Sequence, residues 1–214
     1  MSITFAELGL TPQLAEAVLA AGYETPTPIQ ERAIPALLSG KDIIGQAQTG
    51  TGKTAAYGLP LLQGVQAPGP IQALILTPTR ELAIQVQEQL HTWSKQVRSL
   101  AVYGGQPIPV QFKALRQGVQ VVVATPGRLI DHMERGSIEL SGLKYCVLDE
   151  ADEMLDFGFE EERNTVLEQV PSGCRMALFS ATFPTTIKAL AGRHMASPQK
   201  IEIEATQRTV SAAE

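Results

Sequence analysis

The stretch Ala47-Gln48-Thr49-Gly50-Thr51-Gly52-Lys53-Thr54 decides the fold, and it follows the apolar run Asp42-Ile43-Ile44-Gly45. An apolar strand, a glycine-rich loop and Gly-Lys-Thr at the start of a helix are together typical of a phosphate-binding loop. Ala47 replaces the glycine of the strict pattern, but Gly50 and Gly52 still let the backbone approach phosphate oxygens closely. The alternative is a turn that only reverses the chain, and it does not explain why Lys-Thr opens the helix.

The phosphate-binding interpretation gives the residues of this loop distinct roles. Backbone N–H groups at the helix N-terminus would surround phosphate oxygens. Lys53 would reach the β- and γ-phosphates, and the hydroxyl of Thr54 would bind Mg²⁺. The predicted nucleotide-binding residues of the loop are Thr49, Gly50, Thr51, Gly52, Lys53 and Thr54.

Composition indicates one globular domain, because 44% of the 214 residues are hydrophobic and 18% are charged. The first five residues lack the features of a signal peptide, and no run of about 18 apolar residues occurs, so we expect a cytoplasmic protein without a membrane segment. Cys146 and Cys174 are isolated within apolar runs, which predicts buried, reduced thiols. No metal or catalytic role is predicted for the scattered histidines, His91, His132 and His194.

Apolar, β-branched runs alternate with helical patterns after the phosphate loop. Strands are predicted at Ala73–Leu76, Leu100–Tyr103, Val119–Ala124, Tyr145–Leu148, Met176–Phe179 and Lys200–Ile203. The clearest helix has apolar residues at spacings of three and four, namely Leu82, Val86, Leu90, Trp93 and Val97. Continuously apolar strands that alternate with helices predict an α/β fold, with a mostly parallel sheet covered by helices on both faces.

Two further helices are predicted before the first strand. The first spans Thr11–Ala21 and ends at Gly22, and its apolar face consists of Leu14, Val18 and Leu19. The second begins at Pro28 and ends at Ser39-Gly40. Thr27 as N-cap and Gln30 at the third helical position form a capping box, which gives Gln30 a purely structural interpretation.

Polar segments follow the predicted strands. The carboxyl ends of parallel strands lie at one edge of a sheet, where open α/β folds bind ligands, so we expect these segments to converge. In chain order they are Ala47–Thr54, Thr77–Glu81, Gly104-Gly105, Thr125–Arg128, Asp149–Asp152 and Ser180–Thr182.

Asp149 and Glu150 place two carboxylates directly after the strand Tyr145–Leu148. Asp149 would hold Mg²⁺, through water, and Glu150 would position or deprotonate the attacking water during γ-phosphoryl transfer. A solvated acidic turn is the alternative, since more acidic residues follow. The phosphate loop upstream favours the catalytic interpretation, in which Lys53, Asp149 and Glu150 act together.

Hydroxyl and arginine side chains follow other strands. Ser180 and Thr182 could cap the next helix, or they could bond to Asp149 or Asp152. Arg80 and Arg128 each follow a threonine-rich turn at a helix start, where N–H groups and a guanidinium fork suit phosphodiester oxygens. Helix capping with solvent-facing arginines is the alternative.

The net charge of −5 argues against a large basic surface, so any nucleic acid would have to be bound by local loops. Gly104-Gly105 would permit close approach of the backbone.

The ordered segments of this sequence resemble the first RecA-like domain of DEAD-box RNA helicases. Asp-Glu-Ala-Asp alone is a weak signal, but the matching blocks cover nearly the whole chain in the order of the family. They are Gly22 with Pro26-Thr27-Pro28-Ile29-Gln30, Ala47–Thr54, Pro78-Thr79-Arg80-Glu81-Leu82, Gly104-Gly105, Thr125-Pro126-Gly127-Arg128, Asp149-Glu150-Ala151-Asp152 and Ser180-Ala181-Thr182.

The resemblance implies ATP and Mg²⁺ binding, and ATP hydrolysis coupled to RNA unwinding. Gln30 would read the adenine edge through its amide, and Tyr23 would stack on the base. Phe5, the aromatic residue upstream, would support the segment around Gln30. The coupling contacts would come from Asp152, Ser180 and Thr182. The RNA backbone would be bound, without reading sequence, by Pro78, Thr79, Arg80, Gly104, Gly105, Thr125, Pro126, Gly127 and Arg128.

The resemblance also implies a domain organisation. We expect residues 1–40 to be a helical segment of the same domain, 41–204 to be the RecA-like core, and 205–214 to begin an interdomain linker. Members of the family carry a second RecA-like domain whose arginines complete the ATP site, and nothing in this sequence matches it. We therefore expect this chain alone to bind ATP or ADP but to be nearly inactive in hydrolysis.

Two alternative functions are compatible with the sequence. One is a non-catalytic, nucleotide-gated module that binds RNA without turning over ATP. The other is an ATP-driven DNA helicase or translocase, against which the block around Gln30 argues.

Overall fold

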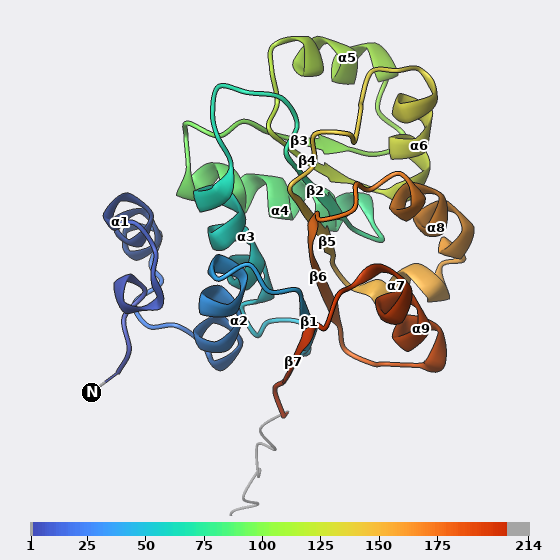
Figure 1. The fold of residues 1–214 in the computed structure, drawn as a ribbon. Coiled ribbons are helices and arrows are strands. Elements are labelled where there is room, and N and C mark those ends of the chain that lie inside the picture. Colours follow the sequence, from blue (N-terminus) through green and yellow to red (C-terminus); the bar gives the residue numbers. More distant parts are fainter. Residues whose placement is uncertain (1, 205–214) are drawn as a thin grey trace, which may run out of the picture.

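A parallel sheet forms the centre of the computed structural model, which describes residues 2–204 (Figure 1). The seven described strands are β1 (Ile43–Gln46), β2 (Ala73–Leu76), β3 (Ser99–Val102), β4 (Val121–Ala124), β5 (Tyr145–Leu148), β6 (Arg175–Ser180) and β7 (Gln199–Glu202). They lie in the order β3-β4-β2-β5-β6-β1-β7, and all neighbours run parallel. The predicted α/β class is confirmed, whereas the predicted linker at 205–214 lies outside the described residues.

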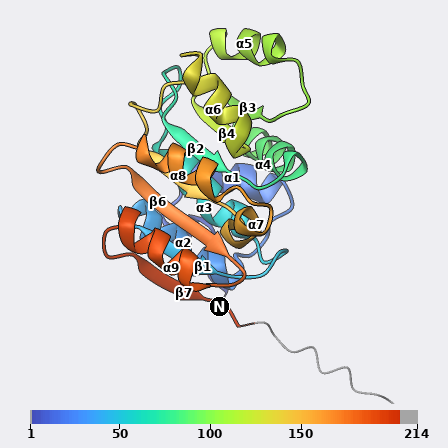
Figure 2. The same ribbon diagram turned by 90° about the vertical axis from the view of Figure 1, so that its right-hand side faces the viewer.

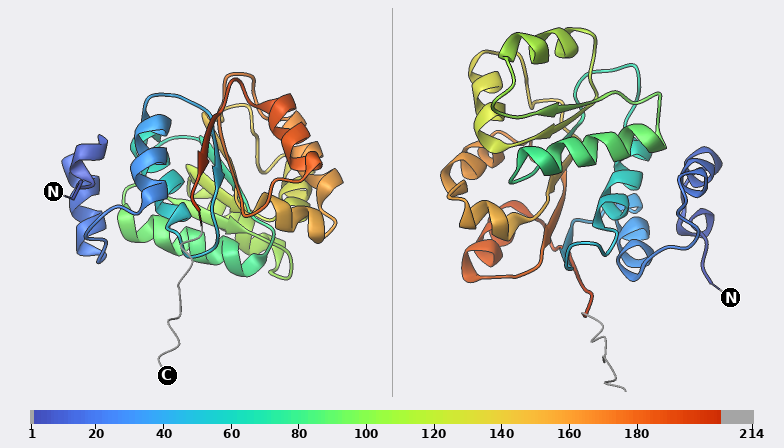
Figure 3. Two further views of the ribbon diagram at one scale, coloured as in Figure 1. Left: turned by 90° about the horizontal axis from the view of Figure 1, so that it is seen from below. Right: turned by 180° about the vertical axis from the view of Figure 1, so that it is seen from behind.

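Helices cover both faces of this sheet. They are α1 (Pro12–Ala20), α2 (Pro28–Leu38), α3 (Lys53–Gly64), α4 (Arg80–Trp93), α5 (Ile108–Arg116), α6 (Pro126–Glu134), α7 (Ala151–Asp156), α8 (Glu160–Glu168) and α9 (Thr185–His194), preceded by a 3₁₀ turn at Ala6–Leu8. The view from below shows α2 and α3 on one side of the sheet and α9 on the other (Figure 3, left). From the side, α7, α8 and α9 lie in front of β6 (Figure 2).

Each face of the sheet has its own hydrophobic cluster, because side chains alternate along a strand. Ile75 of β2 belongs to the cluster under α1 to α4, whereas its neighbours Leu74 and Leu76 belong to the cluster on the opposite face. All four residues of β2 and of β4 are buried, as expected for strands covered on both sides. The continuously apolar sequence of these strands therefore follows from their position.

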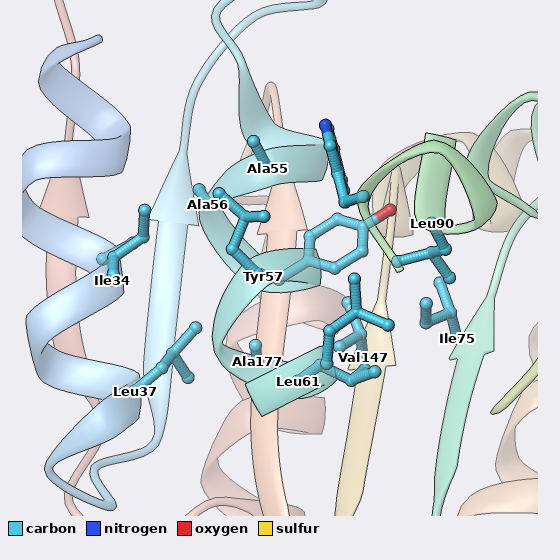
Figure 4. Packing of buried hydrophobic residues seen from close by; sticks show 14 of the residues in the cluster. Ile34, Leu37, Ala55, Ala56, Tyr57, Leu61, Ile75, Leu90, Val147 and Ala177 are labelled. Carbon is cyan, nitrogen blue, oxygen red and sulfur yellow. The ribbon is translucent and has the colours of Figure 1, made fainter. Parts of the chain in front are cut away.

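Helix α3, which follows the phosphate loop, packs into the hydrophobic cluster under α1 to α4. Ala56, Tyr57 and Leu61 of α3 pack among side chains of α2 and of the sheet (Figure 4). A Cβ atom on Gly58 would lie 3.1 Å from both Leu90 and Trp93 of α4, so glycine allows the two helices to approach closely. This packing holds the start of α3 at the carboxyl edge of the sheet.

Three local expectations were wrong. Leu19 is 59% exposed, because Leu14 and Val18, one helical turn apart, already form the buried stripe of α1. Helix α4 ends at Trp93, where the backbone becomes extended, and Val97 is buried from the following loop. Cys146 is buried, but Cys174 is only partly buried before β6, and both thiols are free.

Among residues 2–204, no helix is both long enough and apolar enough to cross a membrane.

Candidate functional site

The loop between β1 and α3 presents a helix N-terminus at the carboxyl edge of the sheet. Gly50 and Gly52 have φ angles of +83° and +88°, a left-handed conformation that glycine adopts without strain. Gly52 is the N-cap of α3, and Lys53 is its first residue. The unpaired N–H groups of this first turn and the positive end of the helix favour an anion.

Two carboxylates face Lys53 from the end of β5. Lys53 Nζ lies 3.6 Å from Asp149 Oδ1 and 3.9 Å from Glu150 Oε1. Only β6 separates β5 from β1, so the parallel sheet itself brings the two loops together. Lys53 and Asp149 are buried and Glu150 is partly buried, so the charges are largely shielded from bulk water.

Glu150 has an unusual backbone and an unusual acidity. Its φ of 50° and ψ of 53° lie in the left-handed region, which non-glycine residues rarely adopt, and it is the N-cap of α7. Burial and then hydrogen bonding to Glu153 raise the pKa of Glu150 to about 7, although Lys53 lowers it. A carboxylate with this pKa can accept a proton near neutral pH, as a general base does.

Tyr57 is a residue of this site that sequence reasoning missed. Its hydroxyl donates a 2.7 Å hydrogen bond to Asp149 Oδ2. Burial, followed by the negative charge of Asp149, raises the pKa of Tyr57, so the phenol keeps the proton that it donates. The spacing could have indicated this role, because Tyr57 follows Lys53 by four residues and lies on the same side of α3.

An open cavity of about 290 Å³ lies between the phosphate loop and α4. It is lined by Tyr23, Thr49, Gly50, Gly52, Lys53, Thr54, Ala55, Leu82, Gln85, Gln89, Asp149 and Glu150. A larger cavity of about 340 Å³ lies between α5 and α6, but it contains none of the predicted site residues. Chemistry rather than size therefore identifies the candidate site.

The cavity also contains groups that suit a divalent cation. Asp149 Oδ1 is buried and has no hydrogen-bond partner among the described residues. The Thr54 side chain lines the same cavity. A carboxylate oxygen that accepts no hydrogen bond from residues 2–204, on the same cavity as a threonine, fits hydrated Mg²⁺, which binds oxygen ligands and keeps several of its waters.

Gln30 lies beside the phosphate loop but does not line this cavity. Its Oε1 accepts a 2.9 Å hydrogen bond from the N–H of Thr27, and its Nε2 donates to the carbonyl of Gly52 at 3.1 Å. Thr27 and Gln30 are arranged as a capping box, although Thr27 Oγ1 itself has no partner within hydrogen-bond distance among the described residues. These two bonds leave one amide hydrogen and one lone pair of Gln30 unused, the number that reading adenine requires, but the residue is only 1% exposed in this arrangement.

Tyr23 lines the same cavity as the acidic pair. Its ring packs edge-on against Trp93, with centroids 5.8 Å apart. Phe5 is buried in the cluster below the same helices. Of these two aromatic residues of the N-terminal segment, Tyr23 lines the cavity and Phe5 does not.

The Asp149–Asp152 segment is bonded to the end of β6. Asp152 N–H donates to Ser180 Oγ at 3.2 Å, while the N–H and hydroxyl of Thr182 donate to Asp152 Oδ2 at 3.1 and 2.9 Å. Burial raises the pKa of Asp152, but hydrogen bonds from Thr182 and Ser180 outweigh it and lower the pKa. Neither hydroxyl caps the next helix, because α9 begins at Thr185 after Pro184.

The loops after β2, β3 and β4 form a second group of predicted site residues. Thr79 caps α4, since its Oγ1 accepts from the N–H of Leu82 at 3.2 Å. The guanidinium of Arg80 lies over the ring of Tyr103, 5.8 Å from its centroid. Arg80 therefore touches the loop that contains Gly104 and Gly105.

Arg128 lies in the first turn of α6, after Thr125 as N-cap and Pro126 as first residue. Its Nη1 donates to the carbonyl of Gln106 at 2.8 Å and to Gln111 Oε1 at 3.3 Å. The arginine is therefore held by the chain, which differs from the freely solvated side chain of the capping alternative. Of the other predicted residues, Pro78 lies in the turn between β2 and α4, and Gly127 lies in the first turn of α6.

Comparisons with known proteins identify the family of this chain. A family model described as DEAD/DEAH box helicase matches residues 27–190. The chain is 52% identical over 213 residues to the ATP-dependent RNA helicase DeaD of Escherichia coli K12, which covers 96% of the chain and 33% of DeaD. It is 47% identical over 214 residues to the DEAD-box ATP-dependent RNA helicase CshA of Bacillus subtilis, with 99% and 43% covered.

A solved structure shows the same fold. The DEAD box protein from Methanococcus jannaschii matches with a TM-score of 0.90 and 42% identity, over 94% of this chain and 56% of that one. The chain spans about a third of the length of DeaD and less than half of CshA. Since the family model matches residues 27–190 of 214, the chain belongs to the DEAD/DEAH box helicase family.

Proposed function

We propose that this chain is the ATP-binding and RNA-binding first domain of an ATP-dependent RNA helicase. The observation that carries the proposal is the convergence of Lys53, Asp149 and Glu150 on one cavity at the N-terminus of α3. In the whole protein, ATP hydrolysis at this cavity would be coupled to local unwinding of duplex RNA. The names of DeaD and CshA as ATP-dependent RNA helicases support the same activity.

The residues of the chain divide the chemistry of ATP hydrolysis among them. The N–H groups of residues 49–54 and Lys53 Nζ bind the β- and γ-phosphates and oppose their charge. Thr54 and, through water, Asp149 would hold Mg²⁺, which supplies further neutralisation of the phosphates. Glu150 Oε1 orients the attacking water and takes up its proton, and Tyr57 keeps Asp149 in position.

The adenine end of the nucleotide is assigned to the N-terminal segment. Tyr23 would stack on the base, and Gln30 would use its remaining hydrogen and lone pair for the adenine edge. Because Gln30 also bonds to the carbonyl of Gly52, base recognition and the shape of the phosphate loop are joined through one side chain.

RNA would lie along the loops after β2, β3 and β4. Arg80 and Arg128, with the N–H groups of the adjoining helix starts, suit the oxygens of a phosphodiester backbone. Asp152, Ser180 and Thr182 join the acidic loop to the end of β6, and we assign them the coupling of hydrolysis to unwinding.

The whole ATP site requires more than this chain. We propose a second RecA-like domain in the full-length protein, because the chain spans only 33% and 43% of DeaD and CshA. An arginine from that domain would stabilise the transition state. Without it we expect nucleotide binding, with hydrolysis slower by on the order of 10³-fold or more.

Steady-state ATP hydrolysis by the full-length protein, with and without single-stranded RNA, tests this proposal. Strong stimulation by RNA supports an RNA-dependent ATPase. RNA binding that depends on nucleotide, without turnover, would instead identify a nucleotide-gated binding module. Stimulation by DNA alone would move the protein to the class of DNA translocases.

A further inference from the structure

Two polar side chains outside the motifs are completely buried beneath the RNA-facing loops. Gln111 of α5 and His132 of α6 both have 0% exposure. Buried polar groups cost free energy unless their hydrogen bonds are made. The hydrogen-bond partners of these two side chains show which segments they hold together.

Gln111 uses its full hydrogen-bonding capacity. Its Nε2 donates to the carbonyl of Tyr103 at 3.0 Å and to Gln106 Oε1 at 2.9 Å. Its Oε1 lies 3.3 Å from Arg128 Nη1 and 2.7 Å from His132 Nε2. The two donors and two lone pairs of the amide are therefore all engaged, and they join α5 to the loop after β3 and to α6.

The chemistry of these partners fixes the orientation of both side chains. The carbonyl of Tyr103 can only accept a hydrogen bond, so the NH₂ group of Gln111 must face it. Gln111 Oε1 then faces His132, and Nε2 of the imidazole must carry the proton. His132 Nδ1 lies 2.7 Å from Ser137 Oγ, which anchors the ring at its other side. Burial lowers the pKa of His132, and the charge of Arg128 lowers it further, so the imidazole is neutral.

We propose that Gln111 and His132 are positioning residues for RNA binding, which hold Arg128 and the Gly104–Gln106 loop in one fixed arrangement. The inference rests on the proposed RNA-binding function of those loops. Both hydrogen bonds of Arg128 to described residues use Nη1, so Nε and Nη2 are free to bind a phosphate through two parallel bonds. Arg80, stacked over Tyr103, is tied to the same network.

The principal variant is Gln111→Met, which keeps the volume of the side chain and removes its four hydrogen bonds. Gln117→Met, at the exposed C-terminal end of the same helix, is the matched control. Affinity for a fluorescein-labelled single-stranded RNA is measured by anisotropy on the full-length protein. We expect the RNA Kd to rise about tenfold in Gln111→Met, with the Kd for ADP and the control unchanged.

Two readouts separate positioning from general damage to the fold. Loss of one phosphate contact reduces the slope of log Kd against log salt by about 0.7 on a single strand. In addition, Gln111→Met has a smaller effect on RNA affinity in an Arg128→Ala background than in the wild type, because part of its effect is exerted through Arg128 and the rest through the Gly104–Gln106 loop. A full additional loss in the double variant overturns the proposal.

A second pair of variants covers the case in which Gln111→Met does not fold. His132→Gln retains a donor near the position of Nε2, whereas His132→Met does not. We expect His132→Met to weaken RNA binding and His132→Gln to restore most of it. Amide hydrogen exchange at residues 104–106 should rise in His132→Met alone.

The possible results distinguish this inference from the proposed function. If the wild-type protein has no RNA affinity with any adenine nucleotide, both the RNA function and the positioning role are overturned. If it binds RNA and the variants bind equally well, only the positioning role fails. Faster exchange at residues 104–106 with unchanged RNA affinity also removes that role.

Discussion

The carboxyl edge of the sheet has two halves that are built differently. At β1 and β5, Lys53 faces two carboxylates without a short hydrogen bond, and Asp149 Oδ1 has no hydrogen-bond partner among the described residues. At β3 and β4, Arg128 and Gln111 are joined by hydrogen bonds to the loop that contains Gln106. The first half, where we propose that ATP and Mg²⁺ bind, therefore keeps polar groups that form no hydrogen bonds within residues 2–204. In the second half, where we propose that RNA binds, the polar side chains are already held by hydrogen bonds to one another. Variants should affect one half without the other.

Glu150→Gln should have the largest effect of any single substitution in the first half. Removal of a general base lowers the rate by about 10² to 10⁴, so RNA-stimulated hydrolysis should fall by this factor while the Kd values for ADP and RNA stay unchanged. Steady-state assays and calorimetry measure these quantities, with the exposed Glu161→Gln as control. Unchanged turnover would remove Glu150 from the mechanism.

The acidity of Glu150 predicts a pH profile for the first half only. Since its pKa is raised to about 7, kcat should fall about tenfold per unit as the pH drops below this value, because the protonated carboxyl cannot accept a proton. RNA affinity should not follow this profile. A kcat that stays constant between pH 7 and pH 5.5 contradicts the assignment.

The same pKa predicts the direction of a stability change. The native carboxyl keeps its proton up to about pH 7, whereas the unfolded one loses it near 4.5, so the folded state loses stability as the pH rises through this window. Urea unfolding at several pH values should show this slope, and Glu150→Gln should remove its contribution.

Gln30→Ala should weaken ADP about fivefold to tenfold while leaving GDP nearly unchanged, since the amide matches the adenine edge. Loss of the bond to the Thr27 N–H should also lower the free energy of unfolding by about 1 kcal/mol. Calorimetry with both nucleotides checks the first effect and urea unfolding the second. A variant that loses stability but has equal affinity losses, or none, would leave Gln30 with capping alone.

Arg80→Ala should produce the smallest effect. The side chain is 54% exposed, so its loss should raise the RNA Kd only about threefold and leave the ADP Kd unchanged. Arg116→Ala, exposed at the far end of α5, is the control. A parallel change in ADP affinity would show that the two halves are not independent.

The sheet and the phosphate loop could be predicted because their signals are local. Strands buried on both faces must be continuously apolar. The phosphate loop and the start of the helix after it form one pattern of consecutive residues. Strand boundaries differ by only one or two residues from the prediction, which is the usual uncertainty of strand ends.

The remaining parts of the site depend on contacts between distant segments. The bond from Tyr57 to Asp149 joins residues 92 positions apart, and Gln111 meets His132 only after α5 and α6 have packed. A buried glutamine has the same local sequence signal as an exposed one. The left-handed backbone of Glu150 is likewise imposed by its surroundings, since glutamate has no preference for that conformation.

The parallel direction of all the strands also has a use in protein engineering. Since every predicted ligand contact lies at or beside the carboxyl edge, the opposite edge can be altered without touching either half. The exposed turn at Ser172-Gly173, between α8 and β6, belongs to that opposite edge. A fluorescent label attached there would mark the domain without touching the edge that carries the predicted ligand contacts.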